Sequence, residues 1–237
     1  MESAETKPRI IMKRITVLLA EDHMVVREGF RKMLELEDGF EVVGEAEDGR
    51  KAVRLAKKLH PDVVLMDIAM PLLNGLEATR QIIKDFPAAK VLMLSAHSDD
   101  AYVKNATGSG AMGFLLKQTS AHEVCRAIRE VQKGNTFFSP SVAKHLQQQR
   151  ERKSPEQGGY LKWANENLTS REMEVLQLVA EGKANKEIAV ELGISIKTVE
   201  KHRDHLMQKL NIHDTAGLTR YAISAGIIES SAFLATV

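Results

Sequence analysis

The stretch Val63–Gly75, VVLMDIAMPLLNG, decides the fold of the first half of the chain. Its first four residues form an unbroken apolar run, which is typical of a strand buried on both faces of a sheet. The run ends in Asp67, and the Met70-Pro71 pair that follows must end the strand. A carboxylate at the mouth of a buried strand loses part of its hydration, so something nearby must compensate for it. The stretch therefore predicts a buried strand that delivers an aspartate with a special role.

Residues 14–133 repeat this strand pattern four more times. Amphipathic segments with helical spacing separate the apolar runs, as in Val26, Phe30, Met33 and Leu34. Strands that alternate with helices predict an α/β domain, here a doubly wound, five-stranded parallel sheet with helices on both faces. The second run is the most polar, so we expect it at an edge. The apolar runs are Ile15–Ala20, Phe40–Ala46, Asp62–Asp67, Lys90–Ala96 and Gly113–Lys117.

Length and composition limit the class of protein. A chain of 237 residues, of which 43% are hydrophobic, is long enough for two modest domains. The single cysteine, Cys125, cannot form an internal disulfide, which fits a reducing cytoplasmic setting. No apolar run reaches the roughly 18 residues of a membrane span, and the N-terminal segment MESAETKPRI has no apolar signal core. We therefore expect a cytoplasmic protein that does not enter a membrane.

Changes in composition divide the chain into four parts. Residues 1–13 are predicted to be a tail and residues 14–133 the α/β domain. Residues 134–164, which include three consecutive glutamines, a Ser-Pro pair and a Gly-Gly pair, are predicted to be a linker. A small all-α domain is expected over residues 165–237, and it begins with a capping box formed by Thr169 and Glu172.

Polar side chains follow four of the predicted strands. Glu21 and Asp22 follow the first, Asp67 ends the third, Ser95 lies at the end of the fourth and Lys117 at the end of the fifth. In a doubly wound sheet, ligands bind beyond the carboxyl ends of the strands, near the switch in strand order. We therefore expect three carboxylates, a hydroxyl and an ammonium group in one crevice.

Such a cluster has the chemistry of a phosphoryl-accepting site. Three close carboxylates repel one another unless a cation lies among them, and Mg²⁺ prefers hard oxygen ligands. The metal and Lys117 would neutralise oxygens while a carboxylate attacks phosphorus. Taken singly, the acidic pair could be a helix cap, Ser95 a turn residue and Lys117 a solvated strand end. Their joint placement at four strand ends favours a site.

The segment NKEIAVELGISIKTVEKHRDHLMQKL in the second domain has helix-turn-helix spacing. Ala189 is small where two helices cross, Gly193 lies at the turn, and Val199 lies on the second helix with Ser195 as its N-cap. The whole-chain net charge of +1 by itself gives no support for nucleic-acid binding. Residues 195–211, however, contain four Lys or Arg residues and two acids, a modest basic patch.

The outward face of this second helix is therefore the candidate DNA reader, with a solvated helix face as the alternative. Side chains at helical spacing on that face can reach base edges in the major groove. The predicted DNA-contacting residues are Lys197, Thr198, Glu200, Lys201, His202, Asp204 and Gln208.

The motifs LLAEDH, VVLMDIAMPLLNG, LMLSAH and GFLLK together resemble the receiver domain of two-component response regulators. By that resemblance Asp67 accepts phosphate from a sensor histidine kinase. Ala69 offers no side chain to orient an attacking water, and His97 is either a substitute or a solvated residue. The resemblance also assigns magnesium binding to Glu21, Asp22 and Asp67, the switch hydroxyl to Ser95, the phosphate-contacting lysine to Lys117 and the switch aromatic to Phe114.

The motifs LTSREMEVL and NKEIAVELGISIKTVEKH resemble the LuxR-type four-helix DNA-binding module, over residues 165 to about 228. With the receiver, they identify the chain as similar to the NarL/FixJ family of response regulators. The resemblance implies a transcription regulator rather than an enzyme. Phosphorylation would switch the receiver, rotate Phe114 inward and promote a homodimer on double-stranded promoter half-sites.

Two other functions compete with this interpretation. One is an adaptor whose helix-turn-helix binds protein instead of DNA. The other is a magnesium-dependent phosphatase with Asp67 as covalent nucleophile, similar to haloacid dehalogenase-like enzymes. Those enzymes need a second aspartate two residues after the nucleophile, and this chain has Ala69 there.

Overall fold

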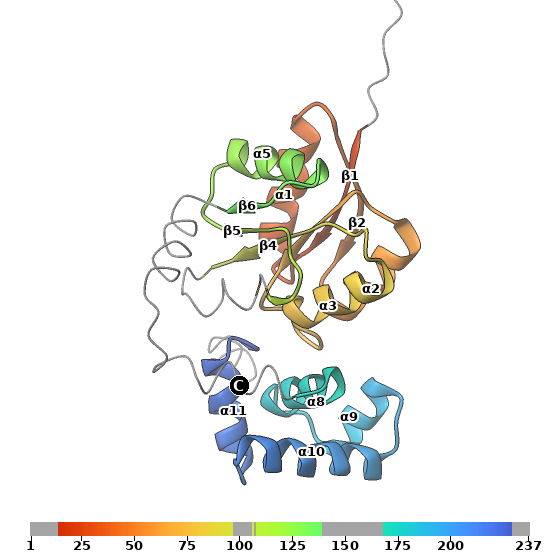
Figure 1. Cartoon of the computed structure of the whole chain (residues 1–237), viewed down its shortest axis with the longest axis vertical. Helices are drawn as coiled ribbons and strands as arrows, with labels where there is room; N and C mark the ends of the chain where they lie inside the picture. The colour runs from red at the N-terminus through yellow and green to blue at the C-terminus, as the bar shows by residue number, and fades with distance from the viewer. Residues whose placement is uncertain (1–13, 97–105, 107, 139–167, 229–237) are drawn as a thin grey trace, which may run out of the picture.

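The computed structural model describes residues 14–96, 106, 108–138 and 168–228, and every structural statement below concerns them. They form an α/β part with a sheet between helices and a helical part that lies beside it (Figure 1). None of the helices in these ranges has both the length and the apolar composition needed to cross a membrane.

The sheet is parallel throughout, with strand order β2-β1-β3-β4-β5-β6. The five predicted strands are present, and the polar second one lies at an edge as expected. A sixth, two-residue strand was not predicted because it is too short to show periodicity; it pairs Phe137 with Gly113 and Phe138 with Phe114. The strands are β1 (Ile15–Ala20), β2 (Phe40–Ala46), β3 (Val63–Asp67), β4 (Val91–Ser95), β5 (Gly113–Leu116) and β6 (Phe137–Phe138).

Helices cover both faces of this sheet, so β3 and β4 are buried along their whole length. One buried cluster packs Leu18, Val64 and Met93 with residues of α2 (Gly49–Leu59) and α3 (Gly75–Asp85). Another packs Leu19 and Leu65 with residues of α5 (Ala121–Gln132). The helix expected between β4 and β5 falls largely outside the described residues. The helices of this part are α1 (Met24–Leu36), α2 (Gly49–Leu59), α3 (Gly75–Asp85) and α5 (Ala121–Gln132).

The loop between β3 and α3 is held tightly. A Cβ on Gly75 would lie 1.9 Å from the carbonyl oxygen of Asp67, and one on Gly49 would lie 1.9 Å from that of Leu73. The Asn74 side chain caps α3 by accepting a hydrogen bond from the Glu77 N–H. Leu72 has a φ of 65°, which costs a non-glycine residue roughly 1–2 kcal/mol. Such a conformation persists only where the surroundings hold it.

The C-terminal part is a bundle of four helices. The predicted capping box is confirmed, because Thr169 and Glu172 exchange hydrogen bonds at the start of the first helix. Gly193 adopts the left-handed conformation at the turn, with a φ of 63°, and Ser195 caps the next helix. The apolar residues Val199, Leu206 and Leu210 of that helix are buried, and Val199 is fully inaccessible. The helices are α8 (Ser170–Ala180), α9 (Asn185–Leu192), α10 (Ile196–Leu210) and α11 (Thr215–Ser224).

Candidate functional site

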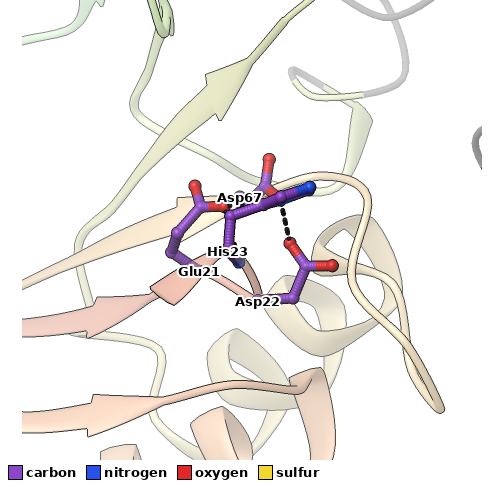
Figure 2. Close-up of side chains that lie close together, drawn as sticks. All are labelled: Glu21, Asp22, His23 and Asp67. Carbon is purple, nitrogen blue, oxygen red and sulfur yellow. Dashed lines mark hydrogen bonds and ion pairs between the residues drawn. The ribbon is translucent and has the colours of Figure 1, made fainter. Parts of the chain in front are cut away.

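An acidic cluster lies where β1 and β3 end (Figure 2). One potential ligand atom from each of Glu21, Asp22, His23 and Asp67 lies within 4.8 Å of the others. Asp67 is 1% exposed and Glu21 is 2% exposed, because the parallel strands that carry them are covered by helices on both faces. The structure thus brings together the three carboxylates named from the sequence.

Lys117 adds the positive charge of this cluster from the end of β5. Its Nζ lies 2.9 Å from Asp67 Oδ2 and 2.9 Å from Glu21 Oε2. It also donates a hydrogen bond of 3.0 Å to Glu21 Oε1. One ammonium group therefore bridges two buried carboxylates, which leaves the cluster with an excess of negative charge.

The electrostatic environment of Asp67 is unusual for an aspartate. Burial, together with the nearby Glu21 carboxylate, raises its pKa to about 7, although Lys117 opposes both. Burial is the largest influence on Lys117 and lowers its pKa, but the charges and hydrogen bonds of Asp67 and Glu21 together outweigh burial, so the net shift of the pKa is upward. Lys117 therefore stays charged at neutral pH, whereas ionised Asp67 needs more positive charge than this lysine provides.

The donor set fits a hard divalent cation. The buried atoms Glu21 Oε2, Asp22 Oδ1 and Asp67 Oδ2 accept no hydrogen bond among the described residues, although each lies near a charged or polar nitrogen. Carboxylate oxygens with unused lone pairs at one strand edge are what Mg²⁺ coordinates in proteins.

His23 is a member of the cluster that was not among the predicted residues. Its Nδ1 lies 2.8 Å from Asp22 Oδ1 and 3.2 Å from Glu21 Oε1, while 63% of its side chain is exposed. The Asp22 carboxylate raises its pKa above the ordinary value. The available signal was its position directly after the acidic pair, at the same strand end.

Two other residues named from the sequence, Ser95 and Phe114, lie on the neighbouring strands β4 and β5. Ser95 ends β4 and is 2% exposed. Phe114 on β5 is fully buried in the core cluster that contains Val64 and Met93. Its side chain is thus already inward in this conformation, so the expected inward rotation does not start from an exposed aromatic here. His97, the candidate for orienting a water, lies outside the described residues.

The candidate DNA face lies on α10, which Figure 1 places on the side of the C-terminal helices away from the α/β part. Thr198 and His202 are half-buried, and the Thr198 hydroxyl lies 2.8 Å from the Ser195 hydroxyl at the helix start. His205 is exposed and lines the same shallow hollow as Lys197 and Lys201, so the structure adds it to the face. The exposed members of the predicted set are Lys197, Glu200, Lys201, Asp204 and Gln208.

Comparison with known proteins supports both halves. Residues 17–129 match the response regulator receiver domain, and residues 166–222 match the luxR family of bacterial regulatory proteins. The chain is 39% identical to the transcriptional regulatory protein DegU of Brevibacillus brevis, over 91% of this chain and 96% of DegU. It is 42% identical to LiaR of Bacillus subtilis, over 88% of this chain and 96% of LiaR.

Solved structures of response regulators are also similar to this chain. The RcsB response regulator of Salmonella typhimurium is 30% identical and matches with a TM-score of 0.54, covering 90% of this chain and 100% of that one. A structure of an RcsB–DNA complex matches with a TM-score of 0.55 at the same identity, over 90% of this chain and 99% of RcsB.

A receiver domain with a parallel sheet, joined to a LuxR-type helical domain, places the chain in the class of two-component response regulators. The chain belongs to the group of such regulators that includes DegU and LiaR, and it is a transcriptional regulator with a LuxR-type DNA-binding domain.

Proposed function

We propose that Asp67 is the phosphoacceptor of this regulator and that a sensor histidine kinase supplies the phosphoryl group. The observation that carries the proposal is the buried Asp67 carboxylate at the end of β3, with Lys117 Nζ 2.9 Å away. A carboxylate oxygen attacks the phosphorus of a phosphohistidine. The new O–P bond forms while the N–P bond breaks, and the imidazole takes up a proton as it leaves.

The neighbouring residues have distinct roles in this proposal. Glu21, Asp22 and Asp67 would hold Mg²⁺, which supplies positive charge against the carboxylate and phosphoryl oxygens when it is bound. Lys117 reaches both Glu21 and Asp67, so it can exchange one oxygen partner for a phosphoryl oxygen with little movement. Ser95 would donate its hydroxyl to the phosphoryl group, and Phe114 behind it would respond by repacking. Phosphoryl transfer here switches the protein, and no turnover reaction is proposed.

DNA is the proposed partner of the C-terminal domain. The exposed face of α10 offers both donors and acceptors, and RcsB, which the chain resembles over most of its length, has been solved with DNA. A small helix-turn-helix domain makes few phosphate contacts, so one copy binds weakly. We infer that phosphorylation favours a homodimer that places two copies on two promoter half-sites. The proposed parts are a receiver over 14–133, a linker over 134–164 and a DNA-binding domain over 165–237, acting in the cytoplasm.

One experiment tests both halves of the proposal. The full chain is treated with acetyl phosphate and Mg²⁺, and intact-mass analysis follows the added phosphoryl group. We expect one group on the wild type and none on Asp67→Asn. Fluorescence anisotropy with a duplex of two half-sites, obtained by selection from random DNA, should show tighter binding only for the phosphorylated wild type, with a steep salt dependence.

Two results would contradict the proposal. Full phosphorylation of Asp67→Asn would place the phosphoacceptor elsewhere. Phosphorylation of the wild type without salt-dependent DNA binding would favour the adaptor function, in which the C-terminal domain binds protein.

A further inference from the structure

The first helix of the DNA-binding domain is buried on all sides. Every residue from Glu172 to Ala180 is buried, although α8 carries polar side chains as well as apolar ones. We call Glu174, Gln177 and Glu181 the polar stripe of α8, because their spacing of three and four residues places them on one face. A polar helix face normally lies in water. Here the receiver covers it (Figure 1).

Gln177 is the centre of this contact. Its Oε1 accepts hydrogen bonds from the Asn74 backbone N–H at 2.7 Å and from Asn74 Nδ2 at 3.1 Å. Its Nε2 donates to the Met70 carbonyl oxygen at 2.9 Å and to Glu181 Oε1 at 2.8 Å. The side chain is 0% exposed, and every donor and acceptor of its amide is used. A fully satisfied buried amide that binds loop backbone indicates a built contact rather than a chance one.

Two further contacts extend the junction on either side of Gln177. Glu181 Oε1 accepts a 3.0 Å hydrogen bond from the Leu72 backbone N–H, and the Leu72 side chain packs on the C-terminal core. This contact holds Leu72 in the left-handed conformation that it would otherwise avoid. At the other end, Glu174 accepts from Gln81 Nε2 at 2.9 Å and pairs with Arg50 at 3.2 Å.

The docked receiver leaves the reading helix open. Its contacts are made with α8 and, through Arg50, with Glu191 at the end of α9 at 3.2 Å. Lys197, Lys201 and Gln208 on α10 are exposed, and α10 itself lies on the far side of the domain in Figure 1. A DNA duplex can therefore approach α10 while the receiver stays in place.

We propose that the polar stripe of α8 is the docking site for the β3–α3 loop of the same chain, and that the docked form is competent to bind a DNA half-site. The second part rests on DNA reading by α10, as proposed above. The receiver sits on the back of the DNA-binding domain and fixes its orientation. The two domains are parts of one chain, so each is at high effective concentration for the other, and the few hydrogen bonds and ion pairs described above suffice for docking.

Hydrogen exchange measured by mass spectrometry tests the docking with variants whose effects must cross between domains. Gln177→Ala changes only the C-terminal domain, yet amides of residues 70–75 in the receiver should exchange about five-fold faster or more. Arg50→Glu changes only the receiver, yet α8 should exchange faster. The matched controls are Gln132→Ala on α5 and the exposed Arg54→Glu on α2, which should leave both regions unchanged.

Two outcomes of the exchange experiment would overturn the docking. One is the absence of any effect across the domain boundary in both variants. The other is protection that appears only when the protein is concentrated ten-fold, which would mean that the receiver of a second copy occupies the stripe.

Anisotropy with a duplex that carries one selected half-site then tests DNA competence in the unphosphorylated chain. The dissociation constant of Gln177→Ala should lie within about two-fold of that of wild type, and the dissociation constant of Arg50→Glu within about two-fold of that of Arg54→Glu. An affinity that rises five-fold or more on undocking would show that the docked receiver blocks α10, and would overturn the second part. Failure of every variant and of the wild type to bind in a salt-sensitive way would refute DNA reading itself, while the exchange data decide the docking independently.

Discussion

Replacing Asp67 with asparagine should stabilise the metal-free protein at neutral pH. The pKa of Asp67 is raised by burial from 3.8 to about 7, so the folded state holds this proton more tightly than the unfolded state. Protonated Asp67 contributes its full stability at pH values below its pKa in the unfolded state. This contribution is lost as the pH rises through its pKa in the folded state. A rise of this size in the pKa corresponds to about 4 kcal/mol. The asparagine side chain cannot ionise, so the variant escapes this loss.

The assay is urea unfolding followed by circular dichroism, in buffer with a chelator, between about pH 4 and pH 7.5. Both proteins share their other titrating groups, so the difference between them reports Asp67 together with its coupling to Glu21 and Lys117. We expect the wild type to lose roughly 3–4 kcal/mol relative to Asp67→Asn across this range.

Magnesium provides the internal control for this prediction. Mg²⁺ stabilises the folded wild type by binding the cluster when its carboxylates are ionised. Millimolar Mg²⁺ should therefore reduce the stability difference between the two proteins at pH 7.5 and have little effect at pH 4. A stability difference that stays flat with pH would refute the argument that burial perturbs Asp67. If Mg²⁺ does not change the pH dependence of the stability difference, Asp67 titrates as argued but the cluster does not bind the metal.

Three further predictions concern other parts of the molecule. Asp22→Ala should weaken Mg²⁺ binding in calorimetry and slow phosphorylation while unfolding temperature stays equal or rises, since it relieves like-charge repulsion; unchanged metal affinity would contradict this. Lys201→Ala should cost about 1–3 kcal/mol on a selected site if it reads a base, or lower the salt slope by about one on all sequences if it contacts phosphate. Binding of this variant like wild type to the selected duplex and to a scrambled one would exclude a contact. Val199→Asp should unfold the C-terminal domain by circular dichroism because it buries an unpaired charge, and a folded variant would contradict the packing.

The sheet and the acidic cluster could be predicted because their signals are local and periodic. Five apolar runs alternate with segments of helical spacing, and the polar residues named from the sequence lie at the ends of those runs or directly after them. Parallel strands bring such ends to one edge, so contacts between Glu21, Asp67 and Lys117 follow from topology alone. His23 was missed because an exposed histidine next to an acidic pair has no periodic signal of its own.

Other features depend on contacts between segments far apart in the sequence. The two-residue strand β6 exists only because β5 offers a free edge to Phe137 and Phe138. Glu174 and Gln177 have the spacing of a solvated helix face, and only the docked receiver buries them. The left-handed conformation of Leu72 likewise gives no sequence signal, because leucine rarely adopts it.

The β3–α3 loop makes the docking sensitive to events at Asp67. The loop begins directly at the proposed phosphoacceptor, and the Gly75 N–H donates to the Ile68 carbonyl oxygen at 2.8 Å, which closes its base. Gln177 binds the middle of the same loop through Met70 and Asn74. Any displacement of the loop that follows phosphorylation must therefore change the Gln177 contacts, and by linkage the docking must change the phosphorylation equilibrium by the same factor. Because α10 is open in the docked form, this coupling acts on how the receiver is placed relative to DNA. It is thereby suited to control the pairing of two chains rather than access to the reading helix.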